Sequence, residues 1–306
     1  MKKMSKNDKR AEKYGFKPIK EFSPVSPYFN LLLRPRTMAS AWKFIVTIIK
    51  DFFLLQDIQK FHLTHRPVIY VDTDLDDKIP FVPHRVKAYL GFIPFFVRPL
   101  GMMIKRLGYK KASTYINYFL EFISYEYKNA ASIYRFCMST THRPDYNEMP
   151  EFKTIHIFDP HLLCVPSLHV TIAAGTWAWY RQCFALGVLP QDEAMFRLSE
   201  FKDNAIAIIE SVLFVKQHSV NCIPLAMYML SATMGKSFFS IDDAMRCMDQ
   251  IFASAPEIDA SLKKEISDYF KFMYERAILE KYYTKNWQDC IKHWLIEHAK
   301  ETNQKI

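Results

Sequence analysis

Two stretches of the chain, residues 160–180 and 217–235, contain no Asp, Glu, Lys or Arg. Runs this long and this apolar have to be buried, in a protein core or in lipid. The chain has only 7 Gly in 306 residues, against 25 Phe and 17 Tyr. Few glycines and long Lys-, Glu- and Leu-containing segments favour helices over strands and turns. We therefore expect an all-α fold, a helical bundle with the two apolar stretches in its core.

The charge pattern divides the chain into three expected segments. Residues 1–37 are basic and interrupted by Pro, which predicts a disordered arm. Residues 38–240 form the expected helical core, and residues 241–306 are expected to be amphipathic helices packed on it. No apolar run follows the first basic residues, so we do not expect a secretory signal peptide.

The formal net charge is +9 and the pI is about 9.1. Such an excess attracts anionic partners: phosphate esters, an anionic membrane surface or nucleic acid. The sequence contains no nucleic-acid-binding motif that interleaves aromatic and basic residues, so nucleic acid is not an expected partner. Its six Cys are scattered without a C-x-x-C pair, which argues against a zinc site and against a disulfide framework.

Outside the apolar stretches, residues 40–62 have the clearest helical periodicity, with Trp42, Ile45, Ile49 and Phe52 at helical spacing. This predicts an amphipathic helix that either covers the core or lies on a membrane surface. Two further helices are expected, each too charged to span a membrane: residues 86–107 and 112–136. A polar stretch is expected to connect the two apolar segments: residues 191–201.

Two groups of residues have the side chains of metal ligands without the pattern of a metal site. The first is an acidic cluster that lacks the Gly and final Glu of a calcium-binding EF-hand loop: Asp72, Asp74, Asp76 and Asp77. In the second, His156, Asp159 and His161 flank a Pro and have no fourth ligand in reach. We expect no metal and no cofactor.

Each apolar stretch contains a His with a hydroxyl or a cation nearby: Ser167 with His169, and Lys216 with His218. Arg143 precedes a Pro, is therefore held extended, and can present its planar guanidinium to a phosphate. Two histidines and cations without metal-ligand spacing suit metal-free phosphoryl transfer. The alternative for His169 alone is an ordinary residue at a helix start beside a core.

Taken together, these motifs resemble those of the type-2 phosphatidic acid phosphatase superfamily, whose all-helical bundle is shared with vanadium haloperoxidases. Over residues 70–235 the similar features are an Ile-Pro-Phe-x-Pro stretch after Asp76, then Arg143-Pro144, Pro166-Ser167-Leu168-His169-Val170 and Lys216-Gln217-His218. The resemblance implies a phosphatase or phosphotransferase that acts on a lipid-like or small phosphate monoester.

The resemblance also implies roles for individual residues. His218 is the implied nucleophile that forms a phosphohistidine, and His169 is the general acid for the leaving group. Arg143, Ser167 and Lys216 bind the phosphoryl oxygens, with Arg135 as the nearest candidate for the first-motif cation. Cys222 stands where the family has the Asp that orients the nucleophile.

Because that carboxylate is missing, a catalytically weakened phosphate-binding pseudoenzyme is an alternative function. A basic protein that binds membrane surfaces is another. We expect a bundle associated with the cytoplasmic membrane through the basic arm and residues 40–62, with a cytoplasmic protein as the alternative.

Overall fold

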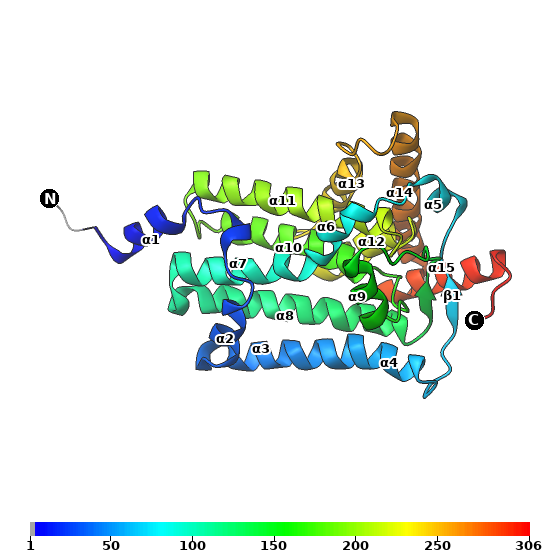
Figure 1. Ribbon diagram of the computed structural model, residues 1–306, viewed down its shortest axis with the longest axis horizontal. Helices are drawn as coiled ribbons and strands as arrows, with labels where there is room; N and C mark the ends of the chain where they lie inside the picture. Colours follow the sequence, from blue (N-terminus) through cyan, green and yellow to red (C-terminus); the bar gives the residue numbers. More distant parts are fainter. Residues whose placement is uncertain (1–3) are drawn as a thin grey trace.

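The computed structural model describes residues 4–306, and nearly all of its elements are helices (Figure 1). In the first half of the chain these are α1 (Lys6–Tyr14), α2 (Ser26–Leu32), α3 (Pro35–Ile48), α4 (Leu54–Lys60), α5 (Asp74–Lys78), α6 (Val86–Leu90), α7 (Phe92–Leu107) and α8 (Tyr109–Tyr134). In the second half they are α9 (Pro150–Phe158), α10 (Leu168–Ala185), α11 (Gln191–Phe214), α12 (Cys222–Met234), α13 (Ile241–Gln250), α14 (Ala260–Glu280) and α15 (Trp287–Glu301). The predicted all-α class is confirmed.

Short elements join these helices. A π-helical turn connects α3 to α4, and three-residue 3₁₀ turns occur at Ile19–Glu21, Pro83–Arg85 and Lys281–Tyr283. The strands β1 (Val68–Tyr70) and β2 (Met138–Thr140) pair in parallel, with Val68 opposite Met138. A further bridge between Ser139 and Leu163 brings the segment before α10 beside β2.

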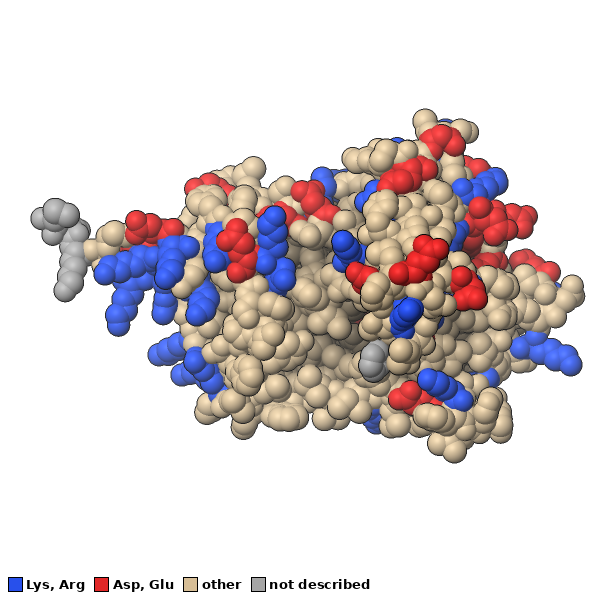
Figure 2. Space-filling model, in the orientation of Figure 1, with Lys and Arg blue, Asp and Glu red and all other residues tan. Residues whose placement is uncertain are grey.

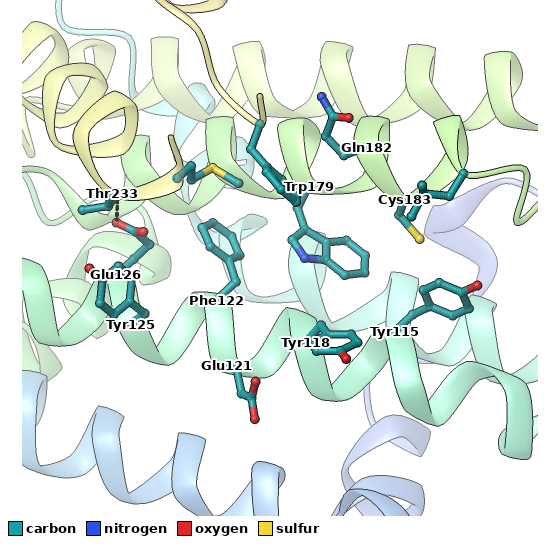
Figure 3. A pocket seen from close by; sticks show the side chains of 13 residues that line it. Tyr115, Tyr118, Glu121, Phe122, Tyr125, Glu126, Trp179, Gln182, Cys183 and Thr233 are labelled. Atoms are coloured by element: carbon teal, nitrogen blue, oxygen red, sulfur yellow. Dashed lines mark hydrogen bonds between the residues drawn. The ribbon is translucent and has the colours of Figure 1, made fainter. Parts of the chain in front are cut away.

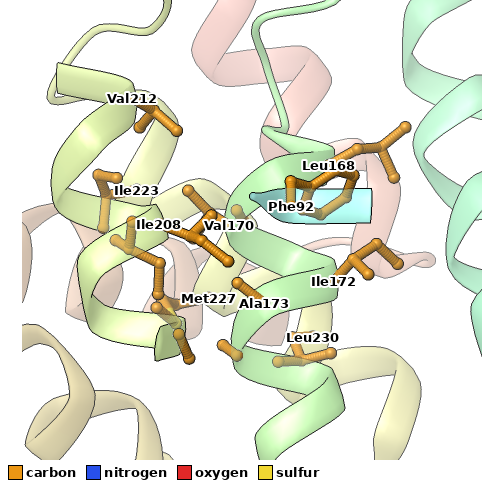
Figure 4. Packing of buried hydrophobic residues seen from close by; sticks show 14 of the residues in the cluster. Phe92, Leu168, Val170, Ile172, Ala173, Ile208, Val212, Ile223, Met227 and Leu230 are labelled. Carbon is orange, nitrogen blue, oxygen red and sulfur yellow. The ribbon is translucent and has the colours of Figure 1, made fainter. Parts of the chain in front are cut away.

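Helix α10 is the centre of the bundle. It packs against α7, α8, α11 and α12, and Figure 1 shows α3, α7, α8, α10 and α11 side by side along the long axis. It begins at Leu168 because the Ser167 side chain caps it by accepting from the Val170 N–H. A helix apolar on all sides belongs in a core, and Ile172 and Ala173 are fully buried. Figure 4 shows this packing, with Ile208 and Ile223 beside α10.

The N-terminal segment differs from the expected disordered arm. Residues 4–37 include α1, a 3₁₀ turn and α2, while residues 1–3 of the expected arm lie outside the described residues. The buried guanidinium of Arg197 donates to the backbone carbonyls of Tyr14, Gly15 and Lys17. These bonds tie the segment to α11. A charge run in the sequence does not reveal such a buried partner far along the chain.

Residues 191–201, expected to be a polar connection, form the first half of α11 instead. Two of their buried charged side chains form ion pairs. Glu193 forms a buried ion pair with Arg106 of α7, at 2.9 Å, and Arg197 pairs with Glu200 at 2.8 Å. Polar residues are stable inside a bundle when their hydrogen bonds are satisfied, so polarity alone was misleading here.

Charged side chains are unevenly spread over the surface. In the face seen in Figure 2, Lys and Arg gather around the N-terminal helices, whereas the area over α3 and α8 is largely uncharged. Helix α3 buries Ala41 and Phe44 against α8 and leaves Trp42 and Val46 exposed. The outward face of α3 is therefore apolar, although it lies on the outside of the bundle.

Candidate active site

The segment 159–167 before α10 is held in place by β2. The Ser139 N–H donates to the carbonyl of Leu162, and the Ser139 carbonyl accepts from the Cys164 N–H. The Ser139 hydroxyl accepts from the Val165 N–H at 2.7 Å. At the other end of the segment, the buried Tyr134 hydroxyl donates to the Pro166 carbonyl. These bonds fix where α10 begins and therefore where Ser167 and His169 lie.

The turn between α11 and α12 carries His218, and the buried Asp76 fixes this turn. Its carboxylate accepts from the Ser219 hydroxyl at 2.7 Å and from the Val220 N–H at 2.8 Å. Burial raises the pKa of Asp76 to about 6, against the lowering effect of the hydrogen bond from Ser219. Within the acidic cluster, Asp76 therefore anchors the turn that presents His218.

Two hydrogen bonds determine the state of the His218 ring. Its Nδ1 lies 3.2 Å from the carbonyl oxygen of Cys164 and its Nε2 lies 3.2 Å from the Ser167 hydroxyl. A carbonyl only accepts, so Nδ1 carries the hydrogen and Nε2 keeps a lone pair, toward which Ser167 donates. Burial, reinforced by His169, lowers the pKa of His218 well below its usual value. His218 is therefore a neutral imidazole with Nε2 as its basic atom.

His169 faces His218, with ring centroids 5.6 Å apart. The Tyr89 ring stacks on the His169 ring, with centroids 4.4 Å apart, and the centroid of the Phe92 ring lies 4.5 Å from that of His169. Burial lowers the pKa of His169 to about 4. Two neutral histidines from the two apolar stretches thus share one small space.

That space is a cavity of about 20 Å³, lined by His161, His169, His218 and Asp159 among others. A second cavity of about 390 Å³ adjoins it and shares Tyr89, Asp159 and His169 as lining residues. The larger cavity, which we call the apolar chamber, is walled by hydrophobic side chains of α3, α6 and α7: Phe44, Ile48, Leu90, Ile93 and Phe96. The arrangement joins a small polar end to a large apolar end, with His169 between them.

Arg143 reaches the edge of this site. Its guanidinium donates to the Asp159 carboxylate at 2.9 Å and to the Asp159 carbonyl at 3.3 Å. Its buried Nε has no hydrogen-bond partner in the part of the chain that the structure describes. Asp159 lines the cavity, so the Arg143 guanidinium at the edge of the site is already paired with a carboxylate.

Lys216 and Arg135, the other two cations expected to bind phosphate, point elsewhere. The Lys216 ammonium donates to the carbonyls of Asp76 and Ile79, at 2.5 and 2.6 Å. Arg135 forms an ion pair with Asp51, on the π-helical turn after α3. The structure thus brings together His169, His218, Ser167 and, at the edge, Arg143.

Cys222 is fully buried at the start of α12, and burial raises the pKa of its thiol, as do the neighbouring Cys164 and Asp76. The His218 nitrogen that a carboxylate would orient is already bonded to the Cys164 carbonyl. Glu210, which is also near in sequence, accepts from the Phe252 N–H at 2.7 Å. A backbone carbonyl thus controls the tautomer, and sequence motifs do not reveal backbone partners.

The sequence suggested only a metal-binding role for His161 and Asp159, yet both side chains line the cavity. The His161 Nε2 lies 2.7 Å from the Thr141 hydroxyl, and the Asp159 carboxylate accepts from the His161 N–H at 2.9 Å. Burial lowers the pKa of His161 well below its usual value. Among residues 4–306, no group of three or more His, Cys, Asp or Glu side chains is arranged to hold a metal ion. The only available signal for His161 was its position just before the Pro-Ser-Leu-His motif.

Comparisons of the chain with protein-family models, curated proteins and solved structures gave no match. Within residues 4–306, none of the helices has the length and apolarity needed to cross a membrane.

Proposed function

We propose that this chain is a metal-free phosphoesterase that acts through a phosphohistidine on a lipid-like or small phosphate monoester. The observation that carries the proposal is the pair His169 and His218. Two apolar segments far apart in the sequence each contribute a neutral imidazole to one cavity, with ring centroids 5.6 Å apart. In this pair, the Nε2 of His218 is available as a nucleophile because Nδ1 is bonded to the Cys164 carbonyl.

The chemistry has two steps. His218 Nε2 forms a bond to phosphorus while the bond between phosphorus and the ester oxygen breaks, and the leaving oxygen takes a proton from His169. A water molecule then attacks phosphorus and breaks the N–P bond, giving its proton back to His169. The Ser167 hydroxyl, freed from Nε2 in the first step, can turn to a phosphoryl oxygen.

His169 has to carry a proton to act as the acid, and its pKa of about 4 leaves it neutral at pH 7 in the free protein. The fraction of protonated His169 therefore falls about tenfold for each pH unit above 4. A bound phosphate anion opposes this fall because it favours the imidazolium. We expect kcat/KM to be highest at acidic pH and to fall toward pH 8.

The apolar chamber gives the substrate its proposed class. A volume of about 390 Å³ walled by hydrophobic side chains suits the hydrocarbon part of a lipid-like ester, with the phosphate directed at His169. Phe44 and Ile48 of α3 line this chamber, and Trp42 and Val46 of the same helix are exposed. We therefore also propose that α3, which walls the chamber, rests with its exposed side on an anionic membrane surface.

A specific observation favours the second candidate, a phosphate-binding protein without turnover. Arg143 is paired with Asp159, and Lys216 and Arg135 bind other parts of the chain. Few free cations then remain to stabilise the charge that develops on the phosphoryl oxygens. A site of this kind holds a phosphate-like anion weakly and reacts slowly.

The test uses dioctanoyl phosphatidic acid and para-nitrophenyl phosphate with the purified chain at pH 5–8. We expect phosphate release that vanadate inhibits and that His218→Ala and His169→Ala each abolish. His293→Ala is the matched control, because His293 is exposed and pairs with Glu280 on the surface. Full activity in the His218→Ala protein would contradict the proposal. Vanadate binding without turnover in the unaltered chain would favour the second candidate.

A further inference from the structure

A second large cavity, of about 480 Å³, lies between α8, α10 and the end of α12. It is independent of the candidate active site and shares none of its residues. Six aromatic side chains line it, and we call it the aromatic pocket: Tyr115, Tyr118, Phe122, Tyr125, Trp179 and Phe238. Figure 3 shows four of these on α8 and Trp179 reaching toward them from α10.

Glu126 lies at one end of the aromatic pocket. Glu126 is fully buried, and its Oε2 accepts from the Thr233 hydroxyl at 3.0 Å (Figure 3). Its Oε1 is also buried and has no hydrogen-bond partner among residues 4–306. Buried carboxyl oxygens are nearly always paired. An unpaired one that lines an apolar cavity indicates a ligand that supplies the missing donor.

The shape of the aromatic pocket is fixed by close packing. A Cβ atom added to Gly175 of α10 would lie 2.6 Å from the tip of the Phe122 ring, so the lack of a side chain at Gly175 lets this ring rest against α10. In this position the ring forms a wall of the cavity. Aromatic faces attract cations, and a cation that also donates an N–H satisfies a carboxylate.

We infer that the aromatic pocket binds an organic amine, whose N–H donates to the Glu126 Oε1 and whose hydrocarbon part packs against the rings of Phe122 and Trp179. An organic ammonium ion meets both features at once, because its N–H pairs with the oxygen and its hydrocarbon part covers the aromatic walls. A purely apolar ligand would leave the oxygen unpaired.

Binding of an amine is linked to pH through Glu126. Burial raises the pKa of this carboxyl to about 8, opposed by the hydrogen bond from Thr233. At pH 7 the empty site is neutral, so an ammonium ligand ionises Glu126 and one proton leaves for solvent. Affinity should then rise with pH up to about 8. Of the other titratable groups that line the pocket, Glu121 is exposed, with its carboxylate directed away from Glu126 in Figure 3, and burial raises the pKa of Cys183 to about 12. The other titratable side chains that line the pocket are Tyr115, Tyr118 and Tyr125.

The test compares two probes by calorimetry: tryptamine, which carries an ammonium group, and tryptophol, which has a hydroxyl in its place. At pH 8 we expect the unaltered chain to bind tryptamine about tenfold more tightly than tryptophol. Glu126→Gln keeps the shape and should abolish this preference. Glu121→Gln removes a carboxylate from the same helix and should leave affinity within about twofold.

A second measurement needs no variant. Tryptamine affinity in the unaltered chain should increase between pH 6 and 8, with release of protons to the buffer. Equal affinity for the two probes, a preference that survives Glu126→Gln, or no binding of tryptamine at millimolar concentration would each overturn the inference.

Discussion

At the scale of single residues, the Cys164 carbonyl orients the His218 ring, the role that the sequence motif assigns to a carboxylate at position 222. It accepts from Nδ1 of His218 and so leaves Nε2 free to react. Cys222 is fully buried, with the Asp76 carboxylate close enough to raise the pKa of its thiol further. The environment of this residue therefore disfavours an anion.

We predict that Cys222→Asp does not restore a catalytic carboxylate but destabilises the protein. An uncompensated buried charge costs about 3–5 kcal/mol. Denaturant unfolding measures this loss, and Cys222→Ala is the control, with a smaller loss expected. A Cys222→Asp protein as stable as the unaltered chain and more active would contradict this view of the site.

Lys216 has an equally structural role. Its ammonium donates to two backbone carbonyls of the segment that carries Asp76, and its backbone φ is +54°. We predict that Lys216→Met lowers the free energy of unfolding by about 1–3 kcal/mol, because both carbonyls lose their donor. KM for a phosphate ester should stay the same. A large rise in KM without a loss of stability would instead assign Lys216 to substrate binding.

At the scale of elements, α3 has apolar side chains on both its inner and its outer side. Its inner side lines the apolar chamber. An exposed stripe at helical spacing runs along its outer side through Trp42 and Val46 to Ile49, the first residue of the π-helical turn. The sequence predicted a helix with one apolar face here. The structure shows that the face turned away from the bundle is also largely apolar. An exposed apolar face rimmed by lysines is typical of a helix that lies on a membrane.

We predict that a double variant, Trp42→Ser with Ile49→Ser, weakens binding to vesicles of phosphatidylcholine and phosphatidylserine by about tenfold or more. The matched control is Tyr282→Ser with Tyr283→Ser, which removes two aromatic side chains that are 81% and 91% exposed. Co-sedimentation with vesicles measures the effect. Equal binding by the α3 variant and the unaltered chain would remove α3 from the membrane proposal.

Other elements show what sequence patterns predict and what they miss. The two uncharged stretches correctly predicted buried segments, because long apolar runs are stable only when they are removed from water. The start of α11 and the packing of α1 depend on Arg197 and Glu193, whose partners lie on distant segments. The same holds in the site. Arg143 is paired with Asp159 through loop geometry, which the spacing of motifs does not contain.

At the scale of the whole molecule, buried groups of both kinds make stability depend on pH. Burial lowers the pKa of His161, His169 and His218, so stability is lost as pH falls below 6.5, their ordinary value. Burial raises the pKa of Asp76 to about 6 and that of Glu126 to about 8. Their contribution is lost as pH rises from about 4 through these values.

We predict that the melting temperature rises as pH is lowered from 8 to 6.5 and stops rising below 6.5, where the histidines oppose the carboxyls. Each group contributes at most about 1.4 kcal/mol per pH unit. Thermal melts in a pH series measure this. Glu126→Gln should flatten the change between pH 8 and 6.5, and His169→Gln should lessen the opposing loss of stability below 6.5. A melting temperature that increases steadily from pH 6.5 to 8 would contradict the assignment.

The size of the polar end of the cavity has a kinetic consequence. At about 20 Å³ it has room for roughly one water molecule, whereas a phosphate group carries four oxygens. The His169 ring, packed against Tyr89 and Phe92, has to shift before such a group enters. Association with vanadate is then a two-step process, and its observed rate should level off at high vanadate concentration, at the rate with which this ring cluster opens.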